Sequence, residues 1–154
     1  MDLAELARRI TVLEDIEAIK QLKARYIRYG DTRNWEGFAT LFTSDYEVEM
    51  DGVPRNSPDL PTSARLQGLD SILAAWRSLL TGVVTAHRAL LPEIEITGPG
   101  TAKGIWALNE TVWMPNCTFN GWGHYHEDYV KVDGVWKIKK TRTTRLRVQE
   151  DWKQ

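Results

Sequence analysis

The chain has 154 residues, of which 42% are hydrophobic and 27% are charged. These values are typical of a globular protein that buries a hydrophobic core, and the length favours a single domain over residues 1–154. The 20 basic and 21 acidic residues give a formal net charge of −1. That balance removes the general electrostatic attraction that a nucleic acid partner would need.

The cysteine count and the apolar runs bear on location. Cys117 is the only cysteine, so no intrachain disulfide can form and a cytoplasmic location is compatible with the sequence. Residues 1–10 hold charges within their apolar pattern, which predicts no signal peptide, and no run of about 18 apolar residues predicts a membrane span. Seven Trp and five Tyr are many for this length, and such side chains fill cores or line pockets for flat apolar ligands.

Residues 3–29 show the periodicity of a helix. Leu3, Leu6, Ile10 and Leu13 follow one another at intervals of three and four residues, which places them on one helix face. Apolar residues as far as Tyr26 roughly continue this stripe, so the pattern predicts one bent helix or two helices. The heptad-like beginning favours packing on this domain, and packing on a neighbouring subunit is the alternative.

The helix is expected to end at Gly30. A glycine there takes the left-handed conformation that often follows a helix, and Asp31 or Thr32 then caps a short helix over residues 35–42. Asp31 therefore has two interpretations, a capping residue or a reactive carboxylate at the mouth of a pocket. Tyr26 likewise is either a partly buried helix tyrosine or a catalytic group.

The middle of the chain combines a strand, a loop and a helix. Residues 46–50 predict a short strand. Three prolines in residues 52–63 predict a loop, which is either a surface connector or a lid over a pocket. Residues 71–80 have apolar residues at helical spacing, with Asp70 or Ser71 as the cap and Gly82 after the end.

From residue 83 the pattern changes to strands. Strands are predicted over residues 83–97, 101–113, 121–132 and 135–148, with a loop over residues 114–120 and a hairpin turn at Asp133-Gly134. Antiparallel strands after a block of helices indicate an α+β fold. We expect one strongly curved, mostly antiparallel sheet with helices closing one side, and no internal repeat or second domain.

Three histidines are present, and His87 is the best candidate for a general base. Imidazole exchanges protons near neutral pH, and the apolar segment around His87 also fits a histidine that is satisfied within the core. His124 and His126 lie two residues apart and share a strand face. No spacing supplies a further ligand, so no metal site is predicted.

Glu110 lies on a strand face that is otherwise small or apolar. A carboxylate buried there needs a partner, and the alternative is a strand end that faces solvent. The last strand is rich in Lys and Arg, and one arginine turned inward would hold Glu110 or a substrate carboxylate. No GxGxxG, GK[ST] or GxSxG motif is present, which argues against nucleotide cofactors and serine hydrolysis.

Several motifs follow one another in a characteristic order. A long helix ends in Tyr-x4-Asp-x3-Trp, a proline-rich loop and a helix come next, a histidine precedes a strand, and long strands with a DGVWKI hairpin finish the chain. This pattern resembles the SnoaL-like, nuclear-transport-factor-2-like (NTF2-like) superfamily over nearly the whole length. It is most similar to the bile acid 7α-dehydratases and more distantly to scytalone dehydratase and a dehydrochlorinase. The resemblance implies a cone-shaped barrel around a deep pocket and no cofactor. It also implies a homo-oligomer, with a trimer favoured.

The resemblance also implies five catalytic residues. DIEAIKQLKARYIRYGD matches the dehydratase helix without a gap and places the family's tyrosine and aspartate on Tyr26 and Asp31. HRALLPEIEI places the catalytic histidine on His87. GIWALNE places an acid on Glu110, where the family has aspartate, and WKIKKTRTTRLR places an arginine on Arg145.

These residues predict a cofactor-independent lyase, a dehydratase that acts on a hydrophobic or aromatic carbonyl compound. His87 is expected to remove a proton next to the carbonyl while Asp31 orients the imidazole. Tyr26 is expected to donate to the developing enolate or to the leaving oxygen, and Glu110 is expected to pair with Arg145. Only the resemblance points to a steroid, and a smaller aromatic or terpenoid body fits the residues equally well.

Two other classes of function are compatible with the same sequence. An isomerase or cyclase begins with the same proton transfer next to a carbonyl. A non-catalytic module for ligand binding or assembly shares the fold, and it would be indicated by Asp31 and His87 lying too far apart for a hydrogen bond.

Overall fold

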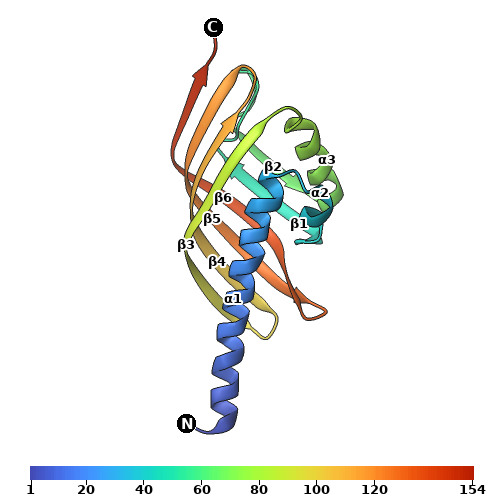
Figure 1. Ribbon diagram of the computed structural model, residues 1–154, viewed down its shortest axis with the longest axis vertical. Coiled ribbons are helices and arrows are strands. Elements are labelled where there is room, and N and C mark those ends of the chain that lie inside the picture. The colour runs from blue at the N-terminus through green and yellow to red at the C-terminus, as the bar shows by residue number, and fades with distance from the viewer.

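The computed structural model describes residues 1–154, which form three helices and six strands (Figure 1). In chain order the elements are α1 (Leu3–Asp31), α2 (Trp35–Ala39), β1 (Phe42–Asp51), β2 (Ser63–Gln67), α3 (Leu69–Leu79), β3 (Val84–Gly98), β4 (Thr101–Trp113), β5 (Cys117–Val132) and β6 (Val135–Trp152). The predicted α+β class is confirmed. None of the helices is both long enough and apolar enough to cross a lipid bilayer.

All six strands form one curved sheet in the order β2-β1-β6-β5-β4-β3. Neighbouring strands are antiparallel, except that β1 and β6 are parallel. The predicted closure into a barrel is wrong, because β2 and β3 remain the two edges of the sheet. Helices close the open side instead: α1 packs against β3, and α3 packs against β1 and β2.

The end of α1 differs from the prediction. Gly30 remains helical, and the residue with a left-handed backbone is Arg33, with a φ of 59°. The Arg33 guanidinium donates to the Gly30 carbonyl at 2.6 Å. This bond satisfies a carbonyl at the helix end that a glycine turn would otherwise satisfy, so α1 continues to Asp31.

The cap of α2 also differs from the prediction. Asn34 caps α2, because its side chain accepts a hydrogen bond from the Gly37 N–H at 3.0 Å. The predicted caps Asp31 and Thr32 are therefore wrong, and the Asp31 carboxylate is free to contact another element. The helix is shorter than predicted, since Phe42 already begins β1.

Three further boundaries were not predicted from the sequence. Strand β2 is a five-residue edge strand that pairs only with β1. Helix α3 begins directly after Gly68 and has no side-chain cap, so the predicted caps Asp70 and Ser71 are wrong. Strand β5 begins at Cys117, which leaves only residues 114–116 of the predicted loop. The hairpin turn at Asp133-Gly134 is confirmed, and both residues have positive φ angles.

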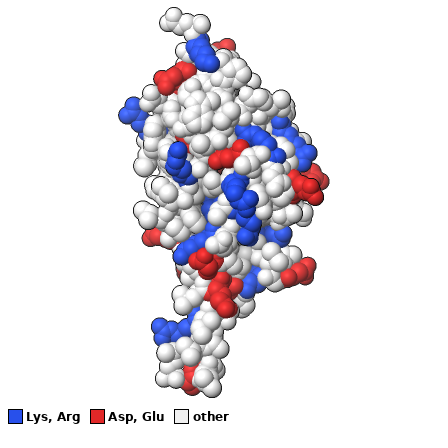
Figure 2. Space-filling view, viewed as in Figure 1, with Lys and Arg blue, Asp and Glu red and all other residues white.

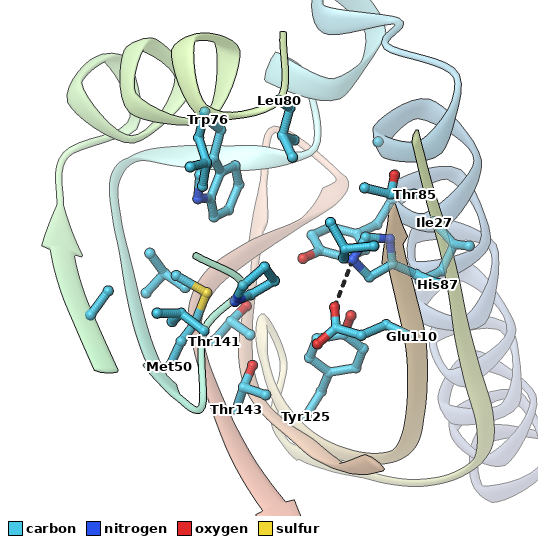
Figure 3. A pocket seen from close by; sticks show the side chains of 18 of the residues that line it. Ile27, Met50, Trp76, Leu80, Thr85, His87, Glu110, Tyr125, Thr141 and Thr143 are labelled. Carbon is cyan, nitrogen blue, oxygen red and sulfur yellow. Dashed lines mark ion pairs between the residues drawn. The ribbon is translucent and has the colours of Figure 1, made fainter. Parts of the chain in front are cut away.

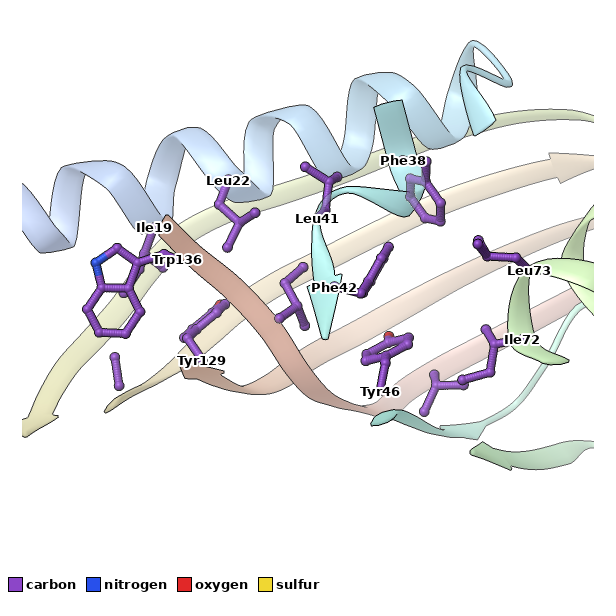
Figure 4. Packing of buried hydrophobic residues seen from close by; sticks show 13 residues of the cluster. Ile19, Leu22, Phe38, Leu41, Phe42, Tyr46, Ile72, Leu73, Tyr129 and Trp136 are labelled. Atoms are coloured by element: carbon purple, nitrogen blue, oxygen red, sulfur yellow. The ribbon is translucent and has the colours of Figure 1, made fainter. Parts of the chain in front are cut away.

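The main core lies between the helices and the concave face of the sheet (Figure 4). Its buried apolar residues are Ile19, Leu22, Phe38, Leu41, Phe42, Tyr46, Val48, Ile72, Leu73, Ala102, Tyr129, Trp136 and Ile138. Burial alternates along β5, where odd-numbered residues are buried and even-numbered ones less so. Tyr125 and Glu127 therefore face the interior, whereas His124 and His126 lie on the outer face of the sheet.

Candidate active site

A cavity of about 210 Å³ lies between the helices and the concave face of the sheet (Figure 3). Sixteen of its 25 lining residues are hydrophobic, so it suits an apolar ligand that a few polar groups orient. Four of the predicted site residues line it, namely Tyr26, His87, Glu110 and Arg145. The fifth, Asp31, is bonded to His87 without lining the cavity itself.

The proline-rich loop, residues 52–62, supplies part of the wall. Val53 and Pro54 line the cavity. The Arg55 guanidinium donates to both carboxylate oxygens of Glu150 in β6, at 2.8 and 2.9 Å, and to the carbonyls of residues 58 and 60 within the loop. These bonds anchor the loop to the sheet, so its beginning forms a wall of the pocket rather than a freely swinging lid.

Asp31 and His87 form the predicted pair. Asp31 is the last residue of α1, and its Oδ1 lies 2.6 Å from His87 Nδ1 in β3. Asp31 Oδ2 accepts the backbone N–H of His87 at 2.9 Å, and Oδ1 also accepts the hydroxyl of Thr85 at 2.9 Å. Three bonds therefore hold the carboxylate against β3, and the distance on which the dyad depends is confirmed.

Glu110 occupies the other side of the same imidazole. The register of β3 and β4 places Glu110 directly opposite His87, and its Oε2 lies 2.9 Å from His87 Nε2 (Figure 3). Glu110 Oε1 accepts from Nη2 of Arg145. The residue is only 5% exposed, so the alternative of a solvent-facing strand end is wrong and the predicted pairing with Arg145 is confirmed.

The two carboxylates determine the charge of the ring. Burial lowers the pKa of His87, but hydrogen bonds and charge attraction from Asp31 and Glu110 outweigh it and raise the pKa to about 9. Burial raises the pKa values of both carboxyls, and their bonds to His87 more than reverse that effect, so both end below their ordinary values. At neutral pH the site holds an imidazolium between two carboxylates.

This charge state changes the role expected for His87. Both ring nitrogens carry protons and donate to carboxylates, so the resting ring has no lone pair with which to accept a proton. A general base at this position requires that the Nε2 proton first moves to Glu110. The role of His87 as a general base stays a prediction, and this proton transfer would be its first step.

Arg145 is held by the backbone at the end of β1. Its Nε donates to the carbonyls of Asp51 and Gly52 at 2.9 and 3.2 Å, which aims the guanidinium at Glu110. Gly121 on β5 provides the space, because a Cβ at that position would overlap the guanidinium of Arg145. The interior arginine predicted for the last strand therefore depends on a glycine in the neighbouring strand.

Tyr26 lies among aromatic rings on the cavity wall. Its ring centroid is 5.3 Å from that of Phe38 and 6.0 Å from those of Phe42 and Tyr125. Burial raises the pKa of Tyr26 well above its ordinary value, and nearby Tyr125 and carboxylates add to this. The phenol therefore stays neutral and is a hydrogen-bond donor over the physiological range.

Three residues of the site were missed in the sequence. Thr85 lies two residues before His87 on the same strand face, and the two-residue period of a strand could have predicted that both side chains face the site. Arg33 donates to the hydroxyl of Thr85 at 2.9 Å and to the carbonyl of Val83 at 2.6 Å, so it fastens the end of α1 to β3. No local pattern predicts that contact. Tyr125 is one of the odd-numbered residues of β5 that face the interior, and the alternation along the sequence does show this.

The histidines of β5 lie apart from the cavity. The ring centroids of His124 and His126 are 6.3 Å apart, and His126 Nε2 lies 3.0 Å from the hydroxyl of Thr144. No group of three or more His, Cys, Asp or Glu side chains has the proximity needed to hold a metal ion.

The chain is similar to known proteins over nearly its whole length. The profile of the SnoaL-like domain matches residues 11–142. A protein of unknown function from Mycobacterium tuberculosis is 25% identical, with a TM-score of 0.73 over 89% of this chain and 75% of that chain. A candidate scytalone dehydratase from Novosphingobium aromaticivorans is 21% identical, with a TM-score of 0.76 over 95% of this chain and 93% of that chain.

A hexachlorocyclohexane dehydrochlorinase from Novosphingobium barchaimii is 17% identical, with a TM-score of 0.75 over 92% of this chain and 93% of that chain. The latter two structures are too distant in sequence to show more than a shared fold. The predicted membership of the superfamily is confirmed, whereas the special likeness to bile acid dehydratases stays a prediction. Because the profile spans most of the chain, the protein belongs to the SnoaL-like domain family.

Proposed function

We propose that the protein is a lyase that eliminates water from a small apolar β-hydroxy carbonyl compound or its vinylogous equivalent, without a cofactor. The observation that carries this proposal is the imidazole of His87, held between Asp31 and Glu110 at the wall of an apolar cavity. Elimination needs one group that accepts a carbon-bound proton and one that protonates the leaving oxygen. His87 and Glu110 are such a pair and share one proton.

The elimination then balances as follows. The Nε2 proton of His87 moves to Glu110, which leaves a neutral imidazole and a neutral carboxylic acid. Nε2 takes the proton next to the substrate carbonyl, and an enolate forms. The enolate electrons return to form the conjugated double bond, the C–O bond to the hydroxyl breaks, and Glu110 gives its proton to that oxygen as water leaves. His87 ends as imidazolium and Glu110 as carboxylate, so the resting state is restored.

Other side chains support these three proton transfers. Asp31 holds Nδ1 and stabilises the imidazolium that forms. Arg145 keeps Glu110 in place and stabilises its carboxylate. Tyr26 donates a hydrogen bond to the enolate oxygen. These residues accept the proton that the substrate loses and supply the proton that the leaving oxygen gains, so the proposed chemistry calls for no cofactor.

The size of the cavity bears on the substrate class. A cavity of roughly 150 Å³ is enough to bind benzene, and this one measures about 210 Å³. We therefore favour a body of one or two rings over the four rings of a steroid. The dehydratase and dehydrochlorinase names of the structural neighbours support an elimination reaction.

An isomerase is the second candidate, and one observation favours it. Glu110 and His87 share a single proton on one side of the cavity, so the proton taken by Nε2 could be returned to another carbon of the same substrate. Product mass separates the two reactions, because elimination lowers it by one water and isomerisation leaves it unchanged.

The test is a panel of one- and two-ring β-hydroxy carbonyl compounds incubated with the protein and followed by mass spectrometry. We expect loss of water from at least one compound, and a drop in turnover of about 10²–10⁴-fold in His87→Ala. His124→Ala on the outer face is the matched control and should retain full turnover. Retained activity in His87→Ala, or binding without any turnover across the panel, would contradict the proposal.

A further inference from the structure

A buried ion pair lies behind the pocket and takes no part in the mechanism above. Lys23 is 1% exposed and Glu127 is 3% exposed, and the ammonium donates to Glu127 Oε1. Glu127 Oε2 accepts a hydrogen bond from the Tyr129 hydroxyl at 2.7 Å. The oxygen of this hydroxyl accepts a hydrogen bond from the Trp106 Nε1–H at 2.9 Å. Removing two charges from water is costly, and an apolar pair often replaces such an ion pair without loss of stability. A role beyond stability is therefore indicated.

The ammonium of Lys23 contacts two tyrosine rings at once. Its Nζ lies 3.9 Å from the ring centroid of Tyr26 and 3.6 Å from that of Tyr125. These two rings meet nearly edge to face, with an interplanar angle of 79°. Both tyrosines line the cavity, whereas Lys23 does not line it. One buried cation therefore fixes two pocket tyrosines relative to each other.

The hydroxyls of these tyrosines have a different partner from that of Tyr129. Tyr129 donates to Glu127, whereas the hydroxyls of Tyr26 and Tyr125 lie within hydrogen-bonding reach of each other. Burial is the main cause that raises the pKa values of Tyr26 and Tyr125 well above their ordinary value, so both phenols remain neutral donors. An anionic oxygen that binds beside two adjacent hydroxyls on the cavity wall accepts a hydrogen bond from each of them.

We propose that Tyr125 is a second catalytic hydrogen-bond donor, which together with Tyr26 binds the enolate oxygen, and that Lys23 is a positioning residue for both. This inference rests on the proposed elimination and specifies the ligand chemistry of that site: a flat, apolar molecule that carries one anionic oxygen. The cation at the ring faces draws electron density from both phenols, which strengthens their O–H groups as donors. Glu127 holds the ammonium in place and neutralises its charge.

A pair of probes tests the site without knowledge of the substrate. 2-Naphthol is flat and ionises at its oxygen, and naphthalene has the same rings without the oxygen. Binding of each to the full chain is measured by fluorescence titration across a pH series. We expect the wild-type protein to prefer 2-naphthol and to bind its anion. Tyr125→Phe should reduce that preference by about 10–100-fold and leave naphthalene binding unchanged.

Tyr29→Phe is the matched control, because it removes a hydroxyl from the same helix as Tyr26 at a position outside the cavity lining. It should leave both affinities unchanged. Equal affinity of the wild-type protein for the two probes, or a Tyr125→Phe variant that keeps the full preference for 2-naphthol, would overturn the two-hydroxyl site.

The role of Lys23 is tested by the double variant Lys23→Met with Glu127→Gln, which removes both charges and leaves no lone buried ion. The pH at which bound 2-naphthol ionises should rise, with naphthalene affinity preserved. A double variant that changes the melting temperature alone, with the ionisation of 2-naphthol unaltered, would make Lys23 purely structural.

The outcomes separate this inference from the proposed elimination. Loss of the 2-naphthol preference in Tyr125→Phe supports the oxyanion site even if no hydroxy carbonyl compound loses water, and the elimination alone then fails. Conversely, dehydration that depends on His87 but not on Tyr125 supports the elimination and overturns the second donor.

Discussion

His87 differs from a free histidine because a carboxylate is bonded to each of its ring nitrogens. Asp31 and Glu110 together make the ring an imidazolium at neutral pH, with a pKa raised to about 9. The same bonds lower the pKa values of the two carboxyls. The imidazole of His87 therefore carries an extra proton at neutral pH, and the loss of this proton at alkaline pH should change both stability and activity.

Stability is expected to fall between pH 6.5 and pH 9. The pKa of His87 is higher in the folded chain than its ordinary value of 6.5, so its contribution is complete below pH 6.5 and is lost as the pH rises through about 9. The loss should amount to about 3 kcal/mol of unfolding free energy. Urea unfolding at several pH values measures it, and His87→Asn should lack this part of the slope. Equal slopes in the two proteins would show that the ring is neutral.

Activity is expected to share this alkaline limit. Turnover requires the proton that His87 and Glu110 share, so kcat/KM should decline above about pH 9. A pH–rate profile on any accepted substrate measures the limit. A profile that instead rises from pH 7 to pH 10 would indicate that a deprotonated His87 is the active form.

Asp31→Asn tests the orienting carboxylate. The amide has the same shape but no charge, so the pKa of His87 should fall and turnover should drop by about 10²–10⁴-fold. NMR titration of the ring and steady-state kinetics measure the two effects. Asp45→Asn is the control, since Asp45 pairs with Lys139 and its side chain is 61% exposed. An unfolded Asp31→Asn variant would mean that the carboxylate mainly joins α1 to β3.

At the scale of the elements, the site depends on how strands β5 and β6 fit together. Strand β5 has a register irregularity between Trp122 and Gly123, and Gly121 leaves room for the Arg145 guanidinium. Arg145 crosses that space to reach Glu110. Gly121 of β5 therefore affects the pocket by leaving room for Arg145 of the adjacent strand β6.

Gly121→Ala is expected to displace Arg145 from Glu110. The added methyl would overlap the guanidinium, so we expect a loss of about 1–3 kcal/mol in stability and at least roughly a tenfold loss of kcat/KM, because one partner of Glu110 is removed. Gly100→Ala is the control, since a Cβ there meets its nearest atom at an ordinary 3.7 Å. Urea unfolding and kinetics measure both variants. Unchanged kinetics in Gly121→Ala would mean that Arg145 does not support Glu110.

At the scale of the whole molecule, the first turns of α1 project beyond the sheet (Figure 1). The stripe of Leu3, Leu6, Ile10 and Leu13 is 84%, 42%, 46% and 65% exposed, so the expectation that it packs on this domain is wrong. The projecting end is narrow and mostly uncharged in Figure 2, and acidic and basic side chains are interspersed over the rest of that face. The heptad-like spacing of this stripe is the one that a second helix of the same kind packs against.

We expect copies of the chain to associate through this stripe, and a trimer stays the prediction. Leu6→Glu combined with Leu13→Glu should lower the mass in solution to that of one chain, 17.7 kDa, because charges replace the apolar contact. Light scattering coupled to size-exclusion chromatography measures the mass. Leu60→Glu is the control, as Leu60 is a comparably exposed residue of the proline-rich loop. A wild-type protein that is already monomeric would contradict the expectation.

The sequence by itself determined the elements whose signals are local. Strand β4 has the predicted bounds, and the Asp133-Gly134 turn needed only two residues that tolerate positive φ. Strand parity singled out Glu110 as an acid on an apolar strand face, and the resemblance to the dehydratases pointed to Tyr26, Asp31, His87 and Arg145.

Only the tertiary structure decided what those residues are bonded to. The end of α1 passes Gly30 because the Arg33 guanidinium satisfies the Gly30 carbonyl, and it also binds the Val83 carbonyl just before β3. No local pattern encodes that contact. The register of β3 and β4 places Glu110 opposite His87, and this contact raises the pKa of the ring. Burial and partner distance determine a pKa, and both arise when strands pair over long separations in sequence.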